Sequence, residues 1–232
     1  MAHLSRSQTK KVQALRICSA LPCAFFLTLN PQTRTAKIKI TSSIEIRRSA
    51  SARLVALADG QGGQAGGALA ARIAIQTALN HLEAARDPFI SDELRTAISL
   101  ADEAVEAHPD AGFSTLIVLA CDQKRIAGAS VGDSMALHIG PRGEMELSDK
   151  QRRRPPLGSG GCLGTPFQYD VRDDEQTLLM SDGVFGYVAP ETLAQTCHES
   201  SDFDVLPRLL GLQKRSANGD LFDDWSAILI RF

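Results

Sequence analysis

Runs of apolar residues and helical periodicities follow one another along the chain and predict its elements. Leu54–Ala58 is continuously apolar and is followed by a glycine-rich stretch, which is typical of a short, fully buried strand. Alanine, leucine and isoleucine then recur at helical spacing over Gln64–Arg86, and this helix should stop near Pro88. A second helix is expected over Ser91–His108, with Ser91 as its N-cap. The pattern therefore predicts one buried strand followed by two consecutive helices.

Short strands that follow one another through turns dominate the rest of the chain. A loop is expected over residues 148–166, a helix over Asp202–Leu212, and one further strand near the N-terminus at Ala14–Ala20. Strands in hairpin order with helices grouped between them indicate an α+β domain with antiparallel sheets and helices packed outside. The strands expected in the second half are Ser114–Cys121, Arg125–Val131, Met135–Ile139, Glu144–Glu146, Phe167–Val171, Gln176–Ser181 and Trp225–Phe232.

Charge is distributed unevenly, although the net charge of the 232 residues is only −2. Residues 1–44 contain seven Lys or Arg and no acid, whereas the remainder carries an excess of acidic groups. With 44% hydrophobic residues the chain suits one domain, which we place at residues 14–232, after a basic tail at 1–13 that is either ordered or disordered. The small net charge gives no indication of a nucleic acid partner.

Two features bear on the compartment. Basic residues precede an apolar run over Ile17–Leu29, which resembles a signal peptide in outline and keeps export as an alternative. Pro22 interrupts this run, no small-x-small cleavage site follows closely, and the run is too short to cross a membrane. The five cysteines are scattered without metal-type or redox-type spacing, and Cys162 has no identifiable base nearby to make it a nucleophile. We therefore expect a cytoplasmic protein that does not engage a membrane.

Aspartates recur at the ends of the apolar strands. Carboxylates next to buried strands are costly unless something neutralises them, and several gathered at one end of a sheet would repel one another. A hard divalent cation resolves this conflict, because sites made only of oxygen suit Mg²⁺ or Mn²⁺. The carboxylates in question are Asp59, Asp133, Asp182 and the adjacent pair Asp223 and Asp224.

Two other interpretations compete with a metal site. A single Asp-Gly after a strand is most often a tight turn, but four such sites at strand ends are hard to explain in that way. The segment Gly60–Ala65 also matches the GxGxxA pattern of dinucleotide-binding folds. Asp59 would then place a negative charge next to the pyrophosphate, and two successive helices stand where a βαβ unit is required. Nucleotide binding is therefore disfavoured.

Five motifs carry a family resemblance. They are Ala58-Asp59-Gly60-Gln61-Gly62-Gly63, Gly112-Phe113-Ser114-Thr115, Gly132-Asp133-Ser134-Met135-Ala136, Ser181-Asp182-Gly183-Val184-Phe185 and Asp223-Asp224-Trp225-Ser226. In order and spacing they resemble those of the metal-dependent type 2C protein phosphatases, the PPM class, over about residues 14–232. The resemblance implies an α/β/β/α sandwich, in which two stacked antiparallel sheets are flanked by helix pairs. It also implies hydrolysis of phosphoserine or phosphothreonine in a phosphoprotein substrate, through a metal-bound water and two Mn²⁺ or Mg²⁺ ions.

The resemblance assigns roles to individual residues. Asp59 would bridge the two ions, and Gly60 would lend its carbonyl to one of them. Asp182 and Asp223 would complete the other, so that Asp59, Asp182 and Asp223 form the catalytic set. Asp133 resembles the ligand of an optional third ion, shared with Asp182.

The N-terminal segment departs from the family pattern. Leu27 stands where the family has a phosphate-binding arginine, and Gln32 where it has an acid that holds the water shell of one ion. One metal site is therefore expected to be weakened, and a bidentate phosphate contact is lost.

Two hypotheses follow for the activity. The preferred one is a metal-dependent serine/threonine phosphatase, because every metal-ligand position after residue 58 is present. The alternative is a pseudophosphatase that keeps the fold and binds a phosphoprotein or a partner kinase. Arg152–Arg154 lies where the family has a variable flap, and is either a contact for acidic groups of a substrate or a solvated charged loop.

Overall fold

The computed structural model describes residues 24–30, 42–61, 66–186, 188–201, 204–216 and 225–232. The strand expected at Ala14–Ala20, the basic tail at 1–13 and the positions Gln32, Asp223 and Asp224 lie outside these residues. Within them, no helix is both long enough and apolar enough to cross a membrane.

The strands form two five-stranded sheets in which every neighbouring pair is antiparallel. The first sheet has the order β1 (Ala24–Asn30), β10 (Trp225–Arg231), β9 (Gln176–Met180), β6 (Met135–Gly140) and β7 (Gly143–Glu146). The second has the order β2 (Ser42–Arg48), β3 (Arg53–Asp59), β4 (Leu116–Cys121), β5 (Arg125–Val131) and β8 (Thr165–Asp170).

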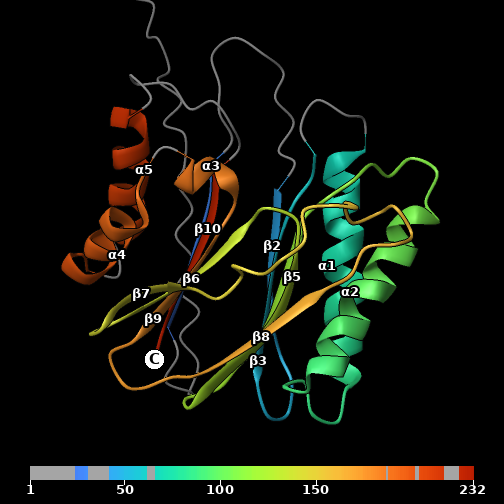
Figure 1. Ribbon diagram of the computed structural model, residues 1–232, viewed down its shortest axis with the longest axis horizontal. Coiled ribbons are helices and arrows are strands. Elements are labelled where there is room, and N and C mark those ends of the chain that lie inside the picture. The colour runs from blue at the N-terminus through green and yellow to red at the C-terminus, as the bar shows by residue number, and fades with distance from the viewer. Residues whose placement is uncertain (1–23, 31–41, 62–65, 187, 202–203, 217–224) are drawn as a thin grey trace, which may run out of the picture.

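Helices cover the outer face of each sheet, so that the chain forms four layers (Figure 1). The long pair α1 (Gly67–Ala84) and α2 (Ser91–Glu106) packs on the second sheet. The first sheet carries α3 (Asp182–Phe185), α4 (Pro190–Glu199) and α5 (Val205–Ser216). The expected α+β sandwich of two stacked antiparallel sheets is thereby confirmed.

The central strands are buried on both faces, and their alternation divides the core into layers. In β3, Leu54 and Ala56 contact the helices, whereas Val55 and Leu57 contact the opposite sheet. All four side chains are fully buried. A strand covered on both sides needs no polar positions, which explains why Leu54–Ala58 is continuously apolar.

Several boundaries differ from those predicted. The N-cap of α2 is Ile90, Ser91 is already helical, and no side chain caps this helix end, so the predicted cap is wrong. The strands β1 and β2 and the helices α3 and α4 were not predicted, and α5 begins at Val205 and extends to Ser216. The edge strand β2 is mostly half-buried, and α4 buries only part of one face, so neither carries a continuous apolar pattern.

Candidate functional site

The strand directions bring three predicted metal ligands to one end of the sandwich. β3 and β5 each pair antiparallel with β4, so they run in the same direction; Asp59 ends β3, and Asp133 follows the end of β5. Met135 pairs with Met180, so Asp182 leaves β9 at the end where the chain enters β6. Figure 1 shows α3, which begins with Asp182, at the same end as the start of α1.

Hydrogen bonds from the two residues before β4 fix the backbone of Asp59. Its N–H donates to Thr115 Oγ1 at 3.0 Å, and its carbonyl oxygen accepts from the Thr115 N–H at 2.8 Å. Ser114 Oγ donates to the same carbonyl at 3.0 Å. These bonds anchor the backbone of Asp59. The residue is half-buried, so part of it remains accessible to solvent.

Gly60 is the point at which the strand end meets the first residue of α1. Gly60 forms an isolated antiparallel bridge with Ser114. The hydrogen bonds lie on either side of this pair: the Thr115 N–H donates to the Asp59 carbonyl, and the Gln61 N–H donates to the Phe113 carbonyl at 2.9 Å. In such a pair the central residues do not bond to each other, so β4 does not use the Gly60 carbonyl. A Cβ at Gly60 would overlap the backbone carbonyl of Gly67. The close approach of two backbones therefore requires glycine at this position.

Thr115 also contacts the turn that carries Asp133. Its Oγ1 lies 2.8 Å from Ser134 Oγ. Gly132 has a φ of +107°, and a Cβ there would lie 2.7 Å from the Thr115 Cβ. One threonine thus joins the two aspartate-bearing segments. The motifs containing Thr115 and Ser134 were recognised in the sequence, but only the aspartates among these motif residues had been given a role.

The loop over residues 148–166 packs against this turn and against α2. The Gly132 N–H donates to the Arg152 carbonyl at 2.9 Å, and Gln151 Nε2 donates to the Ser134 carbonyl at 2.6 Å. At its other end, the carboxylate of Asp102 on α2 fixes the loop. Asp102 is only 3% exposed and accepts from three backbone N–H groups, those of Gly158 at 2.6 Å, Ser159 at 3.0 Å and Cys162 at 3.0 Å.

The environment of Cys162 excludes it as a nucleophile. Burial, and secondly the negative charge of Asp102, raise the pKa of its thiol to about 12. The reactive form of a cysteine is the thiolate, so Cys162 is protonated and inert at neutral pH.

The side chains of Arg152–Arg154 are exposed on the same loop.

Asp182 lies next to the start of β10. The Ser181 N–H donates to the Ser226 carbonyl at 3.0 Å, and the Ser226 N–H donates to Ser181 Oγ at 3.1 Å. Both serines are buried. The two hydrogen bonds join the end of β9, just before Asp182, to the start of β10. In sequence, β10 follows the predicted ligand Asp223.

The described residues do not themselves complete a metal centre. Among them, no group of three or more His, Cys, Asp or Glu side chains is close enough to hold a metal ion. Asp223 lies outside the described part of the chain, as does Gln32. Leu27 lies in β1, opposite Ile228 of β10. The ligand set of Asp59, Gly60, Asp133, Asp182 and Asp223 therefore stays a prediction.

Comparison with known proteins finds a family model that matches part of the chain. Residues 43–154 match the family model of protein phosphatase 2C. This segment of the chain is similar to protein phosphatase 2C. No curated protein matches its sequence.

Solved structures of bacterial serine/threonine phosphatases share the fold. The serine/threonine phosphatase PstP/Ppp of Mycobacterium tuberculosis is 21% identical, with a TM-score of 0.73 over 90% of this chain and 98% of that one. Stp1 of Staphylococcus aureus is 18% identical, with a TM-score of 0.75 over 96% and 99%. The catalytic domain of PstP in complex with two manganese ions is 22% identical, with a TM-score of 0.69 over 90% and 96%.

Proposed function

We propose that the chain is a metal-dependent serine/threonine protein phosphatase that hydrolyses phosphoserine or phosphothreonine in protein substrates. The observation that carries this proposal is the arrangement of Asp59, Asp133 and Asp182 at one end of the sandwich. The first two are linked through Thr115, and the third is held beside β10. The match to the protein phosphatase 2C family model and the fold shared with bacterial phosphatases support the same reaction.

The donor chemistry at this end fits Mn²⁺ or Mg²⁺. Aspartate carboxylates and a carbonyl oxygen that β4 leaves unused are hard oxygen donors, and no sulfur or imidazole donor is among the proposed ligands. Asp59 and Gly60 would hold one ion, and Asp59, Asp182 and Asp223 the other. When bound, such ions supply Lewis-acid activation of water and stabilise charge on the transferring phosphoryl group.

The chain's own residues provide the positioning. Thr115 and Ser114 fix the Asp59 backbone from the β4 side, so that the strand end that carries its carboxylate is already in place when an ion or substrate arrives. The Ser181–Ser226 pair does the same for the segment that begins with Asp182. A fixed backbone beneath the proposed ligands suits a reaction dominated by electrostatic stabilisation.

The N-terminal segment favours a second candidate, a pseudophosphatase that binds a phosphoprotein or a partner kinase. Residues 1–44 contain no acid, so none of them supplies the missing carboxylate, and on the resemblance Leu27 would stand at the position of the phosphate-binding arginine. Loss of such a charge-assisted contact is expected to lower the rate by orders of magnitude. The two candidates differ in turnover and in the number of ions bound, and not in fold.

Hydrolysis of a phosphothreonine peptide in the presence of Mn²⁺ tests the proposal, with Asp182→Asn as the variant and Mn²⁺ binding by calorimetry as a parallel readout. An active phosphatase shows turnover that depends on Mn²⁺ and is lost in the variant. Turnover equal in the two proteins would refute it. One tight Mn²⁺ ion without turnover would establish the pseudophosphatase.

A further inference from the structure

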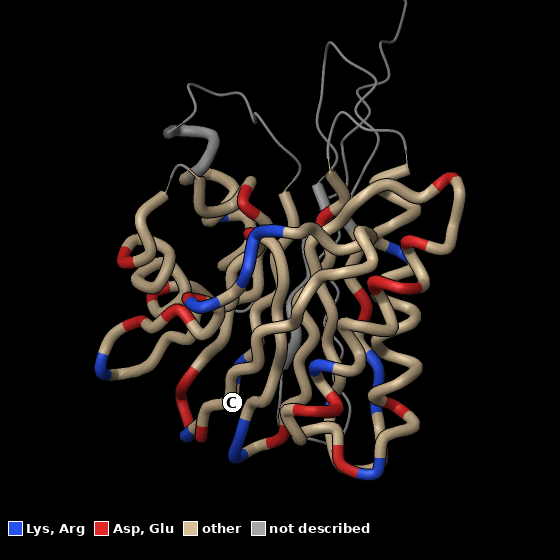
Figure 2. Tube along the Cα trace, turned by 45° about the vertical axis from the view of Figure 1, so that its right-hand side comes forward, with Lys and Arg blue, Asp and Glu red and all other residues tan. Residues whose placement is uncertain are grey.

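A cavity of about 480 Å³ lies at the end of the sandwich opposite the aspartates. Three arginines line it: Arg125 begins β5, Arg142 lies in the turn between β6 and β7, and Arg172 follows β8. Phe89 and Tyr169 contribute aromatic surface, and Asp170 is the single carboxylate in its lining. Figure 2 shows basic and acidic positions interspersed at this lower end of the molecule, near the C-terminus.

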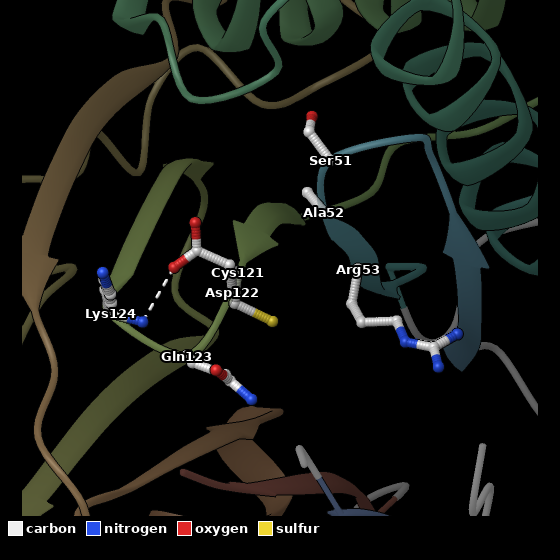
Figure 3. Close-up of a pocket in the computed structure, with 7 residues that line it drawn as sticks. All are labelled: Ser51, Ala52, Arg53, Cys121, Asp122, Gln123 and Lys124. Atoms are coloured by element: carbon white, nitrogen blue, oxygen red, sulfur yellow. Dashed lines mark hydrogen bonds between the residues drawn. The ribbon is translucent and has the colours of Figure 1, made fainter. Parts of the chain in front are cut away.

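Arg125 is held in place before any ligand arrives. Its guanidinium lies 3.7 Å from the centre of the Phe89 ring, and its Nε lies 3.4 Å from Asp122 Oδ2. Asp122 also shapes the β4–β5 hairpin, because its Oδ1 accepts from the N–H of Lys124 at 2.8 Å, as Figure 3 shows, and from the N–H of Arg125 at 3.0 Å. A cation stacked on a ring and fixed at its base loses little freedom on binding an anion.

Arg142 and Arg172, unlike Arg125, are not held in place by side-chain contacts within the described part of the chain. Neither side chain makes a hydrogen bond or an ion pair with the described part of the chain, and both residues are exposed. Both residues line the cavity, and no contact within the described part of the chain uses their guanidinium donors. Arg125 is paired with Asp122, which does not line the cavity, so Arg142 and Arg172 outnumber the one lining carboxylate among the described residues, Asp170.

We propose that this cavity binds a phosphate group, either inorganic phosphate or a phosphate monoester carried by another molecule. Guanidinium groups present paired N–H donors that match phosphate oxygens, and three of them around one cavity suit a dianion better than a carboxylate or an apolar ligand. The proposal does not rest on the phosphatase activity. β5, which separates the arginines from Asp133, has seven residues and spans about 23 Å, so one phosphate group does not reach both sites.

The site is tested by titrating ¹⁵N-labelled protein with inorganic phosphate in the presence of EDTA, while the arginine Nε–Hε resonances are followed by NMR. Arg142→Gln and Arg172→Gln identify the two resonances and, combined in a double variant, remove two donors. Arg72→Gln, an exposed arginine of α1, serves as the matched control. Asp170→Asn removes the lining carboxylate. Sodium chloride at equal ionic strength separates binding from general screening.

The proposal expects saturable shifts of Arg142 and Arg172 with phosphate. Affinity should fall at least about tenfold in the double variant, stay unchanged in Arg72→Gln and rise in Asp170→Asn. Shifts that are linear, that chloride reproduces, or that the double variant does not weaken would overturn it. A phosphothreonine peptide and its unphosphorylated form then distinguish the sources. Tighter binding of the phosphopeptide than of inorganic phosphate assigns the site to phosphoproteins, and equal binding assigns it to the free ion.

Discussion

Thr115 Oγ1 lies 2.8 Å from Ser134 Oγ and 3.0 Å from the backbone nitrogen of Asp59. A single hydroxyl group therefore connects the end of β3 with the turn that follows β5. Because both segments carry a predicted metal ligand, Thr115 is a positioning residue for the candidate site, although it is not a predicted ligand itself.

Thr115→Val should weaken both the fold and metal binding. The substitution leaves the Asp59 N–H without its acceptor and Ser134 without its partner, which costs about 1–3 kcal/mol of unfolding free energy. Urea unfolding measures this loss, and calorimetry with Mn²⁺ measures the change in affinity. Thr96→Val, at an exposed position of α2, is the control and should change neither. Unaltered Mn²⁺ affinity in folded Thr115→Val would show that the threonine has a structural role alone.

Gly60→Ala should be more damaging than its size suggests. The added methyl group meets the Gly67 backbone, which cannot move without displacing the start of α1, so we expect a loss of at least about 1–3 kcal/mol. Gly211→Ala in α5 is an informative contrast, because a Cβ there meets nothing within 4 Å. That substitution should stabilise the protein by about 0.5–1 kcal/mol. Thermal and urea unfolding of the two variants would contradict this account if both changed stability in the same direction.

Asp102→Asn should release the loop over residues 148–166. The carboxylate accepts three backbone hydrogen bonds, and an amide in its place offers one oxygen and directs an N–H₂ group towards donors. We expect a loss of about 1–3 kcal/mol and faster trypsin cleavage at Arg152 or Arg153 under native conditions. Glu103→Gln, an exposed acid on the same helix, is the control. Cleavage at the same rate in all three proteins would mean that Asp102 does not order the loop.

A buried histidine makes stability depend on pH. His138 of β6 is 2% exposed, and burial lowers its pKa below the ordinary value of 6.5, although the neighbouring Glu175 opposes this shift. His138 Nε2 lies 3.3 Å from the Glu175 carboxylate, Nδ1 contacts Thr177 Oγ1, and the ring packs on Tyr169.

The sign of the effect follows from the direction of the shift. The unfolded chain takes up the His138 proton at a higher pH than the folded chain does. The free energy of unfolding is therefore largest above pH 6.5 and falls as the pH decreases from there towards the folded pKa. NMR titration of the His138 ring should give a midpoint below 6.5, and urea unfolding between pH 5 and 8 should show the loss. A midpoint above 6.5 would mean that Glu175 outweighs burial.

The sequence predicted those elements whose burial is complete. β3, β5 and β9 were located almost to the residue, because strands covered on both faces are rich in apolar residues. The N-cap at Ser91 was wrong, since a favourable residue type does not show whether its side chain bonds to the helix end. β2 was not predicted, because it lies at a sheet edge and its mostly half-buried residues do not form a continuous apolar run.

The candidate site was predictable in part for a similar reason. Aspartates at strand ends are visible in the sequence, and their arrival at one end of the sandwich follows from antiparallel pairing. The contact between Thr115 and Ser134 was not predictable, because it depends on the register between β4 and β5 and on the positive φ of Gly132. The cavity lined by Arg125, Arg142 and Arg172 combines residues from both sheets, so no local sequence pattern predicts it.

The exposed loop at Arg152–Arg154 also divides the chain into two pieces that share both sheets. A break after Arg153 leaves β5 paired with β8 across the cut in one sheet, and β6 with β9 and β1 with β10 in the other. Neither fragment holds a complete sheet of its own. The cut protein should therefore remain a two-chain complex under native conditions, and separately produced halves should fold only when they meet. This loop is accordingly the natural place to split the domain into complementing fragments.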